Sequence, residues 1–252
     1  MFFTPLEQFQ IISIFSIKLF CFDFSITNLF LIAFSSFLAL LFLIKLISYK
    51  NNSFYIIPST WQIIIETICD VVAQLLYDNL NMKGEKFFPF ITVLFSYILF
   101  NNLIGLVPYS FTITSHLIIT FSLSLSVFIG VNIIGYKIHK SDMLSLFIPS
   151  NTSFGLALLL VPIEFVSYIF KPISLGVRLF ANLMAGHTLL KVIVGFSWSM
   201  LMLDDLLFYV HIIPLLVLII LMGLELAVAV IQAYVFTLLS ALYFGMATAE
   251  HH

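Results

Sequence analysis

The chain has 252 residues, of which 62% are hydrophobic and 9% charged, and its formal net charge is −2 at pH 7. Soluble domains carry about 25% charged residues, so this composition excludes an ordinary soluble protein and indicates a polytopic membrane protein. There is no basic patch of the kind that binds nucleic acid. The two cysteines, Cys21 and Cys69, show no metal-ligand spacing and are interpreted as apolar residues. We expect neither a metal ion nor a cofactor.

The first third of the chain predicts two helices of different character. The N-terminal segment, residues 1–24, does not resemble an arginine-rich transit peptide. Residues 25–48 form an apolar run that is long enough to span the hydrocarbon core. Residues 61–80 instead predict an amphipathic helix that lies at the membrane surface or on other protein. Its apolar face comprises Ile64, Ile65, Ile68, Val71, Val72, Leu75 and Leu76.

Residues 87–136 predict a hairpin of two spanning helices joined by a turn near residues 108–115. With this topology six lysines share one side of the membrane, and Lys18 alone is on the other. The positive-inside rule then places the N-terminus outside and the amphipathic helix on the cytoplasm-like side, which in a mitochondrion is the matrix. The six lysines are Lys45, Lys50, Lys83, Lys86, Lys137 and Lys140.

The last hundred residues hold two apolar segments, 144–203 and 206–249, each far longer than the ~20 residues of an upright span. They must be broken, strongly tilted, or both, and Pro162, Pro172 and Pro214 would permit breaks. No internal repeat of the kind found in inverted-repeat transporters is visible. The predicted fold is therefore an all-α polytopic membrane protein that forms a single membrane domain.

Charged and amide side chains stand inside these two segments. Arg178 is the single arginine of the chain, and an arginine at membrane depth costs at least about 2.5–3.5 kcal/mol on insertion scales. It cannot realistically lose its proton to escape that cost. Glu164 lies 14 residues earlier, about 21 Å along a helix and on nearly the same face. Further candidate functional residues are Asn182, His187, Glu225 and Gln232.

These residue types favour a proton relay. Glutamate and histidine can exchange protons when burial and neighbours tune their pKa values, whereas arginine stays charged. A fixed cation with exchangeable groups on both sides describes two half-channels that do not join directly. Glu225 and Gln232 are seven residues apart and therefore share a helix face. Small residues beside these groups would allow another helix to approach closely: Ala181, Ala185, Gly186, Gly223, Ala227, Ala229 and Ala233.

The motif Ser174–His187, with Glu164 upstream and the stretch from Glu225 to Gln232 downstream, resembles subunit a of the rotary ATP synthase. The resemblance covers nearly the whole chain. The opening Pro5-Leu6-Glu7-Gln8-Phe9 is similar to plant and protist mitochondrial forms. The pairing of a histidine at 187 with a glutamate at 225 is also typical of mitochondrial and related bacterial forms.

The resemblance implies a stator proton-channel subunit, without catalytic chemistry of its own, in the mitochondrial inner membrane. Its last two helices would lie steeply tilted against a ring of c subunits, each with one carboxylate. The implied partners are this c-ring, the peripheral stalk, other membrane-sector subunits and lipid. Arg178 would block a short circuit between the two half-channels and favour the deprotonated ring carboxylate. The implied proton path uses Asn182, His187, Glu225 and Gln232 for entry and Glu164 for exit to the matrix.

One position departs from the family pattern. The mitochondrial family usually has an Asp-Ala pair near the end of the last helix, and Met246 stands in place of that acid here. We expect Met246 to mark the far end of the entry path. The missing entrance group could come from the C-terminus, although those residues could equally form a solvated end. The candidates are Glu250, His251 and His252.

Structural interpretations stay open beside these roles. Arg178 could pair with a neighbour, Glu225 and His187 could form interhelical hydrogen bonds, and Glu164 could cap a helix break. The pair Asn101–Asn102 could line the entry path or pack between helices. Two lysines, Lys171 and Lys191, are interpreted as extending to the membrane interfaces.

Other classes of membrane protein fit the sequence less well. A secondary transporter or an ion-pumping subunit of a respiratory complex usually places lysines and glutamates in discontinuous central helices, often with repeats. A structural scaffold would have no need of charged groups inside apolar helices.

Overall fold

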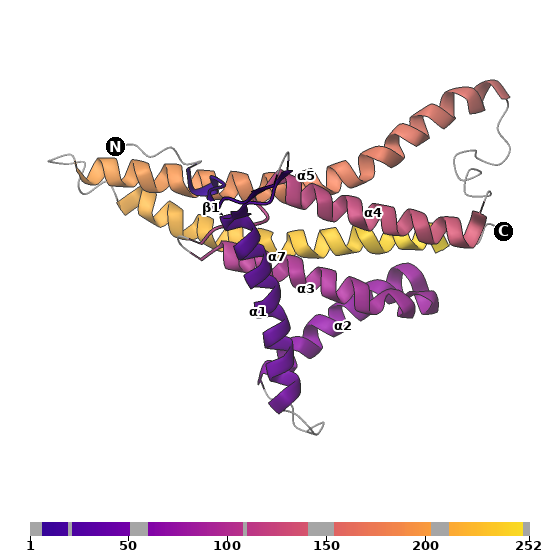
Figure 1. Cartoon of the computed structure of the whole chain (residues 1–252), viewed down its shortest axis with the longest axis horizontal. Coiled ribbons are helices and arrows are strands. Elements are labelled where there is room, and N and C mark those ends of the chain that lie inside the picture. Colours follow the sequence, from indigo (N-terminus) through magenta and orange to yellow (C-terminus); the bar gives the residue numbers. More distant parts are fainter. Residues whose placement is uncertain are drawn as a thin grey trace.

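The computed structural model describes residues 7–19, 22–50, 60–107, 110–140, 154–202 and 212–248. This part of the chain is almost entirely helical, which confirms the predicted all-α fold class (Figure 1). After a short 3-10 helix, η1 (Glu7–Phe9), and four short strands, the helices follow in chain order. They are α1 (Asn28–Lys50), α2 (Thr60–Leu80), the 3-10 helix η2 (Asn81–Phe87), α3 (Phe88–Gly105), α4 (Leu117–His139), α5 (Phe154–Leu201) and α7 (Ile212–Thr248).

The N-terminal segment contains two small antiparallel ladders that no sequence pattern predicted. Strand β1 (Ser13–Phe15) pairs with β4 (Ile26–Thr27), and β2 (Lys18–Leu19) pairs with β3 (Phe22–Asp23). Asn28, the first residue of α1, forms side-chain hydrogen bonds with this segment. Its Nδ2 donates to the Gln10 carbonyl at 3.1 Å, and its Oδ1 accepts from the Ile12 amide at 3.2 Å. The segment is therefore anchored at the start of α1.

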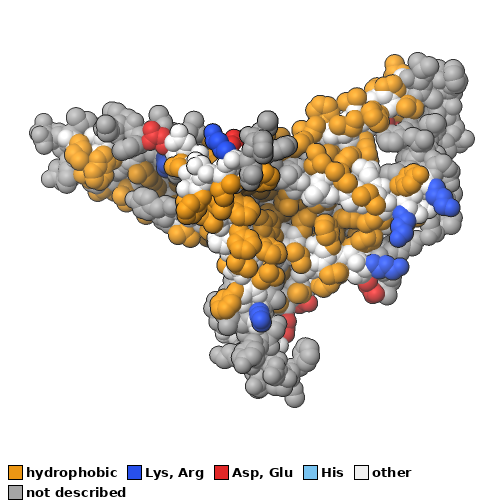
Figure 2. All heavy atoms as spheres, in the orientation of Figure 1, with side chains coloured by type: hydrophobic (Ala, Val, Ile, Leu, Met, Phe, Trp, Pro, Cys, Tyr) orange, Lys and Arg blue, Asp and Glu red, His pale blue; other side chains and the backbone are white. Residues whose placement is uncertain are grey.

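Four helices in the described part of the chain are long and apolar enough to cross a membrane. The first two, Gly84–Gly105 and Leu117–His139, correspond to the two spans predicted within residues 87–136, and the other two lie in α5 and α7. The helices α3 and α4 each pack mainly against other helices, including α7, rather than against one another. Within α1, Asn28–Phe42 is a shorter apolar helix, so its role as a span stays a prediction. Figure 2 shows a surface that is mostly hydrophobic, with charged side chains gathered toward the ends of the molecule, as a bilayer environment requires.

Both long C-terminal helices are unbroken. Pro162 and Pro172 lie inside the 48-residue helix α5, and Pro214 lies in the first turn of the 37-residue helix α7. Figure 1 shows that α5 descends obliquely before it runs beside α4 and α7. Proline bends a helix because it removes an amide donor and crowds the preceding turn. A 37-residue helix is about 55 Å long, which exceeds the ~30 Å hydrocarbon core and supports the predicted tilt.

Helix α2 is amphipathic and packs against α3 and α7, as the sequence predicts for a helix that does not span. Val72, Leu75 and Leu76 are buried on its inner face. Part of the predicted apolar face lies outside this contact, since Ile64 is 50% exposed and Val71 is 44% exposed. The contact with α3 and α7 follows a narrower stripe than the hydrophobic residues alone indicate.

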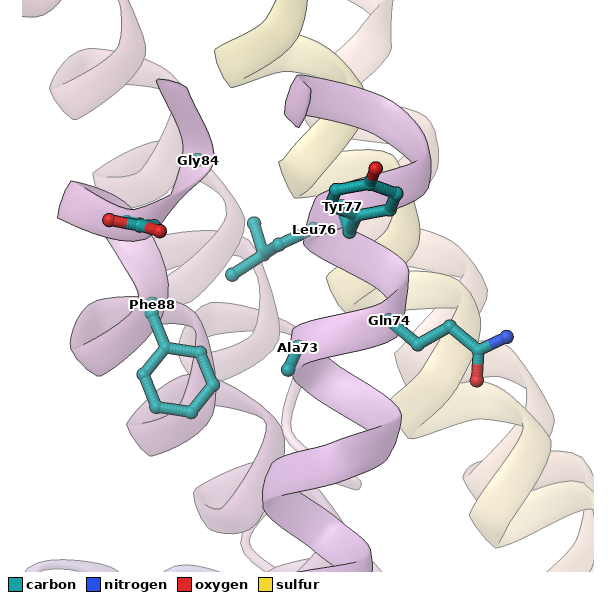
Figure 3. Close-up of a pocket in the computed structure, with 7 residues that line it drawn as sticks. Ala73, Gln74, Leu76, Tyr77, Gly84 and Phe88 are labelled. Atoms are coloured by element: carbon teal, nitrogen blue, oxygen red, sulfur yellow. The ribbon is translucent and has the colours of Figure 1, made fainter. Parts of the chain in front are cut away.

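A cavity of about 500 Å³ lies between α2 and the start of α3. Figure 3 shows Leu76 and Ala73 directed toward this space and Gln74 directed away from it. The remaining lining residues are Tyr77, Gly84, Glu85 and Phe88.

The free thiol of Cys69 also belongs to α2. Burial, followed by the nearby Asp70 and Glu66 carboxylates, raises the pKa of this thiol. A raised pKa keeps a cysteine protonated and unreactive, which agrees with its interpretation as an apolar residue. Cys21 lies outside the described residues.

The hydrophobic core forms where α2, α3, α4, α5 and α7 meet. Gly176 lies at the contact between α5 and α4. A Cβ at this position would lie 2.8 Å from Ser124 Oγ and 3.1 Å from the Phe121 Cα. Helices pack this closely only where one of them presents a small residue. Fully buried core side chains include Val72, Ile91, Ile98, Val127, Leu175, Leu179 and Phe236.

We expect Gly176→Ala to destabilise the protein by about 1–3 kcal/mol, because the methyl group meets backbone that cannot move aside locally. The measurement is the amount of the chain in the assembled complex and the temperature at which the complex dissociates. Gly130→Ala in α4 is the matched control, since a Cβ there meets nothing within 4 Å among the described residues. Equal losses in the two variants would contradict the prediction.

Candidate functional site

Helices α5 and α7 run antiparallel and bring four of the predicted proton-path residues together in two pairs. Asn182 Nδ2 donates a hydrogen bond to Gln232 Oε1 at 2.9 Å. His187 Nδ1 lies 3.9 Å from Glu225 Oε1. Sequence spacing placed Glu225 and Gln232 on one face of α7, and the structure adds the residue of α5 that each one faces.

The close approach of the two helices depends on small residues. A Cβ at Gly186 would lie 2.5 Å from Glu225 Oε1, so this glycine makes room for the carboxyl group. Ala229 and Ala233 are also buried, at 2% and 0% exposure. The other predicted small residues do not face a helix within the described part of the chain. Ala181, Ala185, Gly223 and Ala227 are exposed.

Burial differs sharply among the candidate residues. Glu225 and Gln232 are 7% and 4% exposed, and both Glu225 carboxyl oxygens lack a hydrogen-bond partner among the described residues. Buried polar groups without partners are rare in native structures and commonly mark functional sites. Glu164 is half-buried, whereas Arg178 is exposed on the outer face of α5. No carboxylate in the described part of the chain lies within ion-pair distance of Arg178. The alternative that Arg178 forms an ion pair with a neighbouring side chain therefore has no support from the described residues.

His187 is enclosed from three directions besides its own helix. Glu225 of α7 faces its Nδ1, and the Phe9 ring of η1 lies edge-on at 6.1 Å between centroids. At the end of α3, a Cβ at Gly105 would lie 3.8 Å from His187 Nε2. Phe9 was not among the sequence candidates, and its place in the N-terminal Pro-Leu-Glu-Gln-Phe motif was the one available signal.

The adjacent asparagines of α3 pack between helices. Asn102 Nδ2 donates to the Ala229 carbonyl of α7 at 3.2 Å, and Asn101 Nδ2 donates to the Tyr97 carbonyl at 2.9 Å. Their Oδ1 atoms are buried without a partner among the described residues. The packing alternative is thus confirmed for the Asn102 amide, which joins α3 to α7, whereas the Asn101 amide bonds within α3. A role of the oxygens in the entry path stays a prediction.

Lys171 contacts aromatic rings of two helices, and its predicted extension to the membrane interface stays a prediction. Its ammonium lies over two aromatic rings, 5.3 Å from the Tyr168 centroid and 5.6 Å from the Tyr243 centroid. Tyr168 in turn donates a hydrogen bond to Asn132 of α4. The i−3 spacing of Tyr168 could have indicated the first contact, but Tyr243 belongs to a different helix and gave no signal. Lys191 is exposed, and its extension to the membrane interface stays a prediction.

The position of Met246 corrects the expectation for the end of α7. Its Sδ lies 3.9 Å from the Lys171 Nζ. Because the helices are antiparallel, late residues of α7 face early residues of α5, so Met246 lies on the Glu164 side of Arg178. It therefore cannot mark the far end of an entry path through His187. The proposed entrance groups Glu250, His251 and His252 lie outside the described residues.

Comparison with known proteins identifies the family of the chain. The sequence pattern of the ATP synthase A chain family matches residues 29–245. ATP synthase subunit a of Pylaiella littoralis is 56% identical over 252 residues, which is the full length of both chains. The Chondrus crispus subunit a is 48% identical over 240 residues, or 95% of this chain and 94% of that protein. The Marchantia polymorpha subunit a is 41% identical over 251 residues, or 98% and 99%. The chain therefore belongs to the ATP synthase A chain family, the proton-translocating subunit a of the enzyme's membrane sector.

Proposed function

We propose that this chain forms two offset half-channels that deliver protons to a rotating c-ring and remove them again, and thereby drives ATP synthesis. The observation that carries the proposal is the position of Arg178. It lies on the exposed face of α5, between the His187–Glu225 pair on one side and Glu164 on the other. A permanently charged group at that place separates two sets of exchangeable groups.

The entry half-channel is assigned to the interface between α5 and α7. Protons from the intermembrane space would pass the His187–Glu225 pair and then the Asn182–Gln232 pair. Glu225 and Gln232 are two helical turns apart, about 10.5 Å along α7. The unpartnered oxygens of Glu225 are available to take up and release a proton, which is what a relay group must do.

The surface that would meet the ring is the exposed face around Arg178. Ala181 and Ala185 follow Arg178 along the same face of α5, and Gly223 and Ala227 are exposed on α7. Exposed small residues on apolar helices permit the close approach of another membrane helix. A ring carboxylate that has taken up a proton can turn into lipid, because its desolvation cost has fallen. The membrane potential contributes about 2.3 kcal/mol per proton per 100 mV.

The exit half-channel is assigned to the Glu164 side of Arg178. A ring carboxylate that arrives there after nearly a full turn would give up its proton toward the matrix. Arg178 favours this step because a nearby fixed cation stabilises the deprotonated carboxylate. Glu164 Oε2 is buried without a partner among the described residues, which supports a role in accepting that proton.

The proposal includes a location and a set of partners. The chain would lie in the mitochondrial inner membrane with its N-terminus toward the intermembrane space. Helix α2 would then lie on the matrix side and contact the peripheral stalk, which its exposed Glu66, Asp70 and Asp78 support.

Purification of the intact complex tests the proposal. We expect the chain to copurify with a ring of small two-helix proteolipids, each with one membrane carboxylate. A cysteine at Gly223 should form a disulfide with a cysteine placed beside that carboxylate. Recovery of the chain in a complex that lacks such a ring would contradict the proposed function.

A further inference from the structure

Phe9 differs from every other apolar residue described in the N-terminal segment before α1. It is 9% exposed, whereas its neighbours Ile11, Ile12, Ile14, Phe15 and Ile17 are 46–63% exposed. The segment is therefore not a generally buried strand or an apolar plug. It buries the ring of Phe9 and leaves those of Phe15 and Phe24 exposed.

The Phe9 ring packs against the His187 imidazole. The two rings meet at an interplanar angle of 63°, in the edge-to-face arrangement that aromatic pairs prefer. On its other sides the imidazole faces Glu225 and the close approach of Gly105. Phe9 is therefore a further neighbour of the imidazole, in addition to Glu225 and Gly105, and it belongs to a segment remote from α5 in sequence.

Hydrogen bonds order the segment that carries the Phe9 ring. The Gln10 amide donates to the Glu7 carbonyl at 3.1 Å and closes the turn that carries Phe9. Gln10 is in turn tied to Asn28 at the start of α1, and the Asn28 amide donates to the Ile12 carbonyl at 3.1 Å. These bonds, from the backbone and from the Asn28 side chain, anchor the turn that carries Phe9 to the start of α1.

We propose that Phe9 is a positioning residue of the proton entry path, which holds the His187 imidazole toward Glu225 and keeps bulk water from that side of the ring. The inference rests on the proposed function of His187. The His187–Glu225 separation of 3.9 Å is longer than a direct hydrogen bond. A small rotation of the imidazole therefore decides whether a proton can pass between the two groups.

The test compares Phe9→Tyr, which keeps the aromatic ring, with Phe9→Leu, which keeps an apolar side chain but removes the aromatic ring. ATP-driven proton pumping is measured in vesicles that contain the whole complex, and each rate is divided by the amount of assembled complex. We expect Phe9→Leu to lower the rate about threefold to tenfold, the scale of one aromatic contact, and Phe9→Tyr to stay near the unmodified rate. Phe15→Ala, which removes an aromatic ring of the same segment that is 63% exposed, is the control.

Unchanged pumping in Phe9→Leu, or an equal loss in Phe9→Tyr, would overturn the positioning role. A purely structural role would lower the amount of assembled complex and leave the normalised rate unchanged, which also overturns the proposal. The variant His187→Gln distinguishes a failure of the proposed function of His187 from a failure of the proposed role of Phe9. If this variant pumps normally, the proposed function of His187 fails; if it is impaired while Phe9→Leu is normal, only the role of Phe9 fails.

Discussion

Replacing Arg178 with alanine should abolish proton-driven ATP synthesis, with a loss of at least about a hundredfold, while the complex still assembles. Arg178 is exposed and makes no ion pair in the described part of the chain, so its removal leaves no buried charge without a partner. What disappears is the fixed cation that separates the two half-channels. The measurements are ATP synthesis under an imposed proton gradient and the amount of assembled complex.

Arg178→Lys separates the role of charge from the role of a permanent, planar cation. We expect this variant to be badly impaired as well, because a lysine ammonium is a compact point charge that can lose its proton when desolvated. Near-normal ATP synthesis in the alanine variant would refute the barrier role outright. Near-normal synthesis in the lysine variant alone would show that any positive charge at this place is sufficient.

Gly186→Ala should lower the rate of ATP-driven proton pumping by about tenfold to a hundredfold, because it displaces the neighbouring carboxyl group of Glu225. The new Cβ would lie 2.5 Å from Glu225 Oε1 and 3.0 Å from its Cδ. The end of a glutamate side chain can move aside cheaply, so the fold should survive. The carboxyl group must then leave its position opposite His187, and a misplacement of about 1 Å in a reacting group can cost about a hundredfold.

Gly195→Ala is the matched control for this glycine. Gly195 belongs to the same helix, and a Cβ there meets nothing within 4 Å among the described residues. The Gly195→Ala complex should pump protons at the normal rate, and the alanine should stabilise the helix slightly. A Gly186→Ala complex that pumps as fast as the control would show that the position of Glu225 is not critical.

The sequence predicted the elements of the fold better than their contacts. Long apolar runs indicate spans wherever they occur, and the spacing of Glu225 and Gln232 on one helix fixes a shared face. The partners of these residues depend on the antiparallel register of α5 and α7, which arises only from packing. For this reason spacing alone could not show that His187 contacts Glu225, a pairing that only the family resemblance indicated. The sequence also assigned Met246 to the wrong side of Arg178.

Other differences have local causes. Pro162 and Pro172 were expected to permit breaks, but α5 continues through both because a proline can bend a helix without ending it. Phe9 and Tyr243 have no periodic pattern that points to His187 or Lys171. Their contacts join segments that are distant in sequence, and a single chain without packing information contains no signal for them.

The two tyrosines around Lys171 have a consequence for how this chain responds to acidity. Met246 offers a thioether to the Lys171 ammonium, and the rings of Tyr168 and Tyr243 lie within cation–π distance of it. The attraction of a cation to an aromatic face comes from the ring quadrupole. A carboxylate partner would be neutralised as the surrounding compartment acidifies, and its hold on the lysine would fade. A neutral tyrosine ring takes up no proton as its surroundings acidify, so this contact should keep its strength under conditions in which a carboxylate contact would weaken.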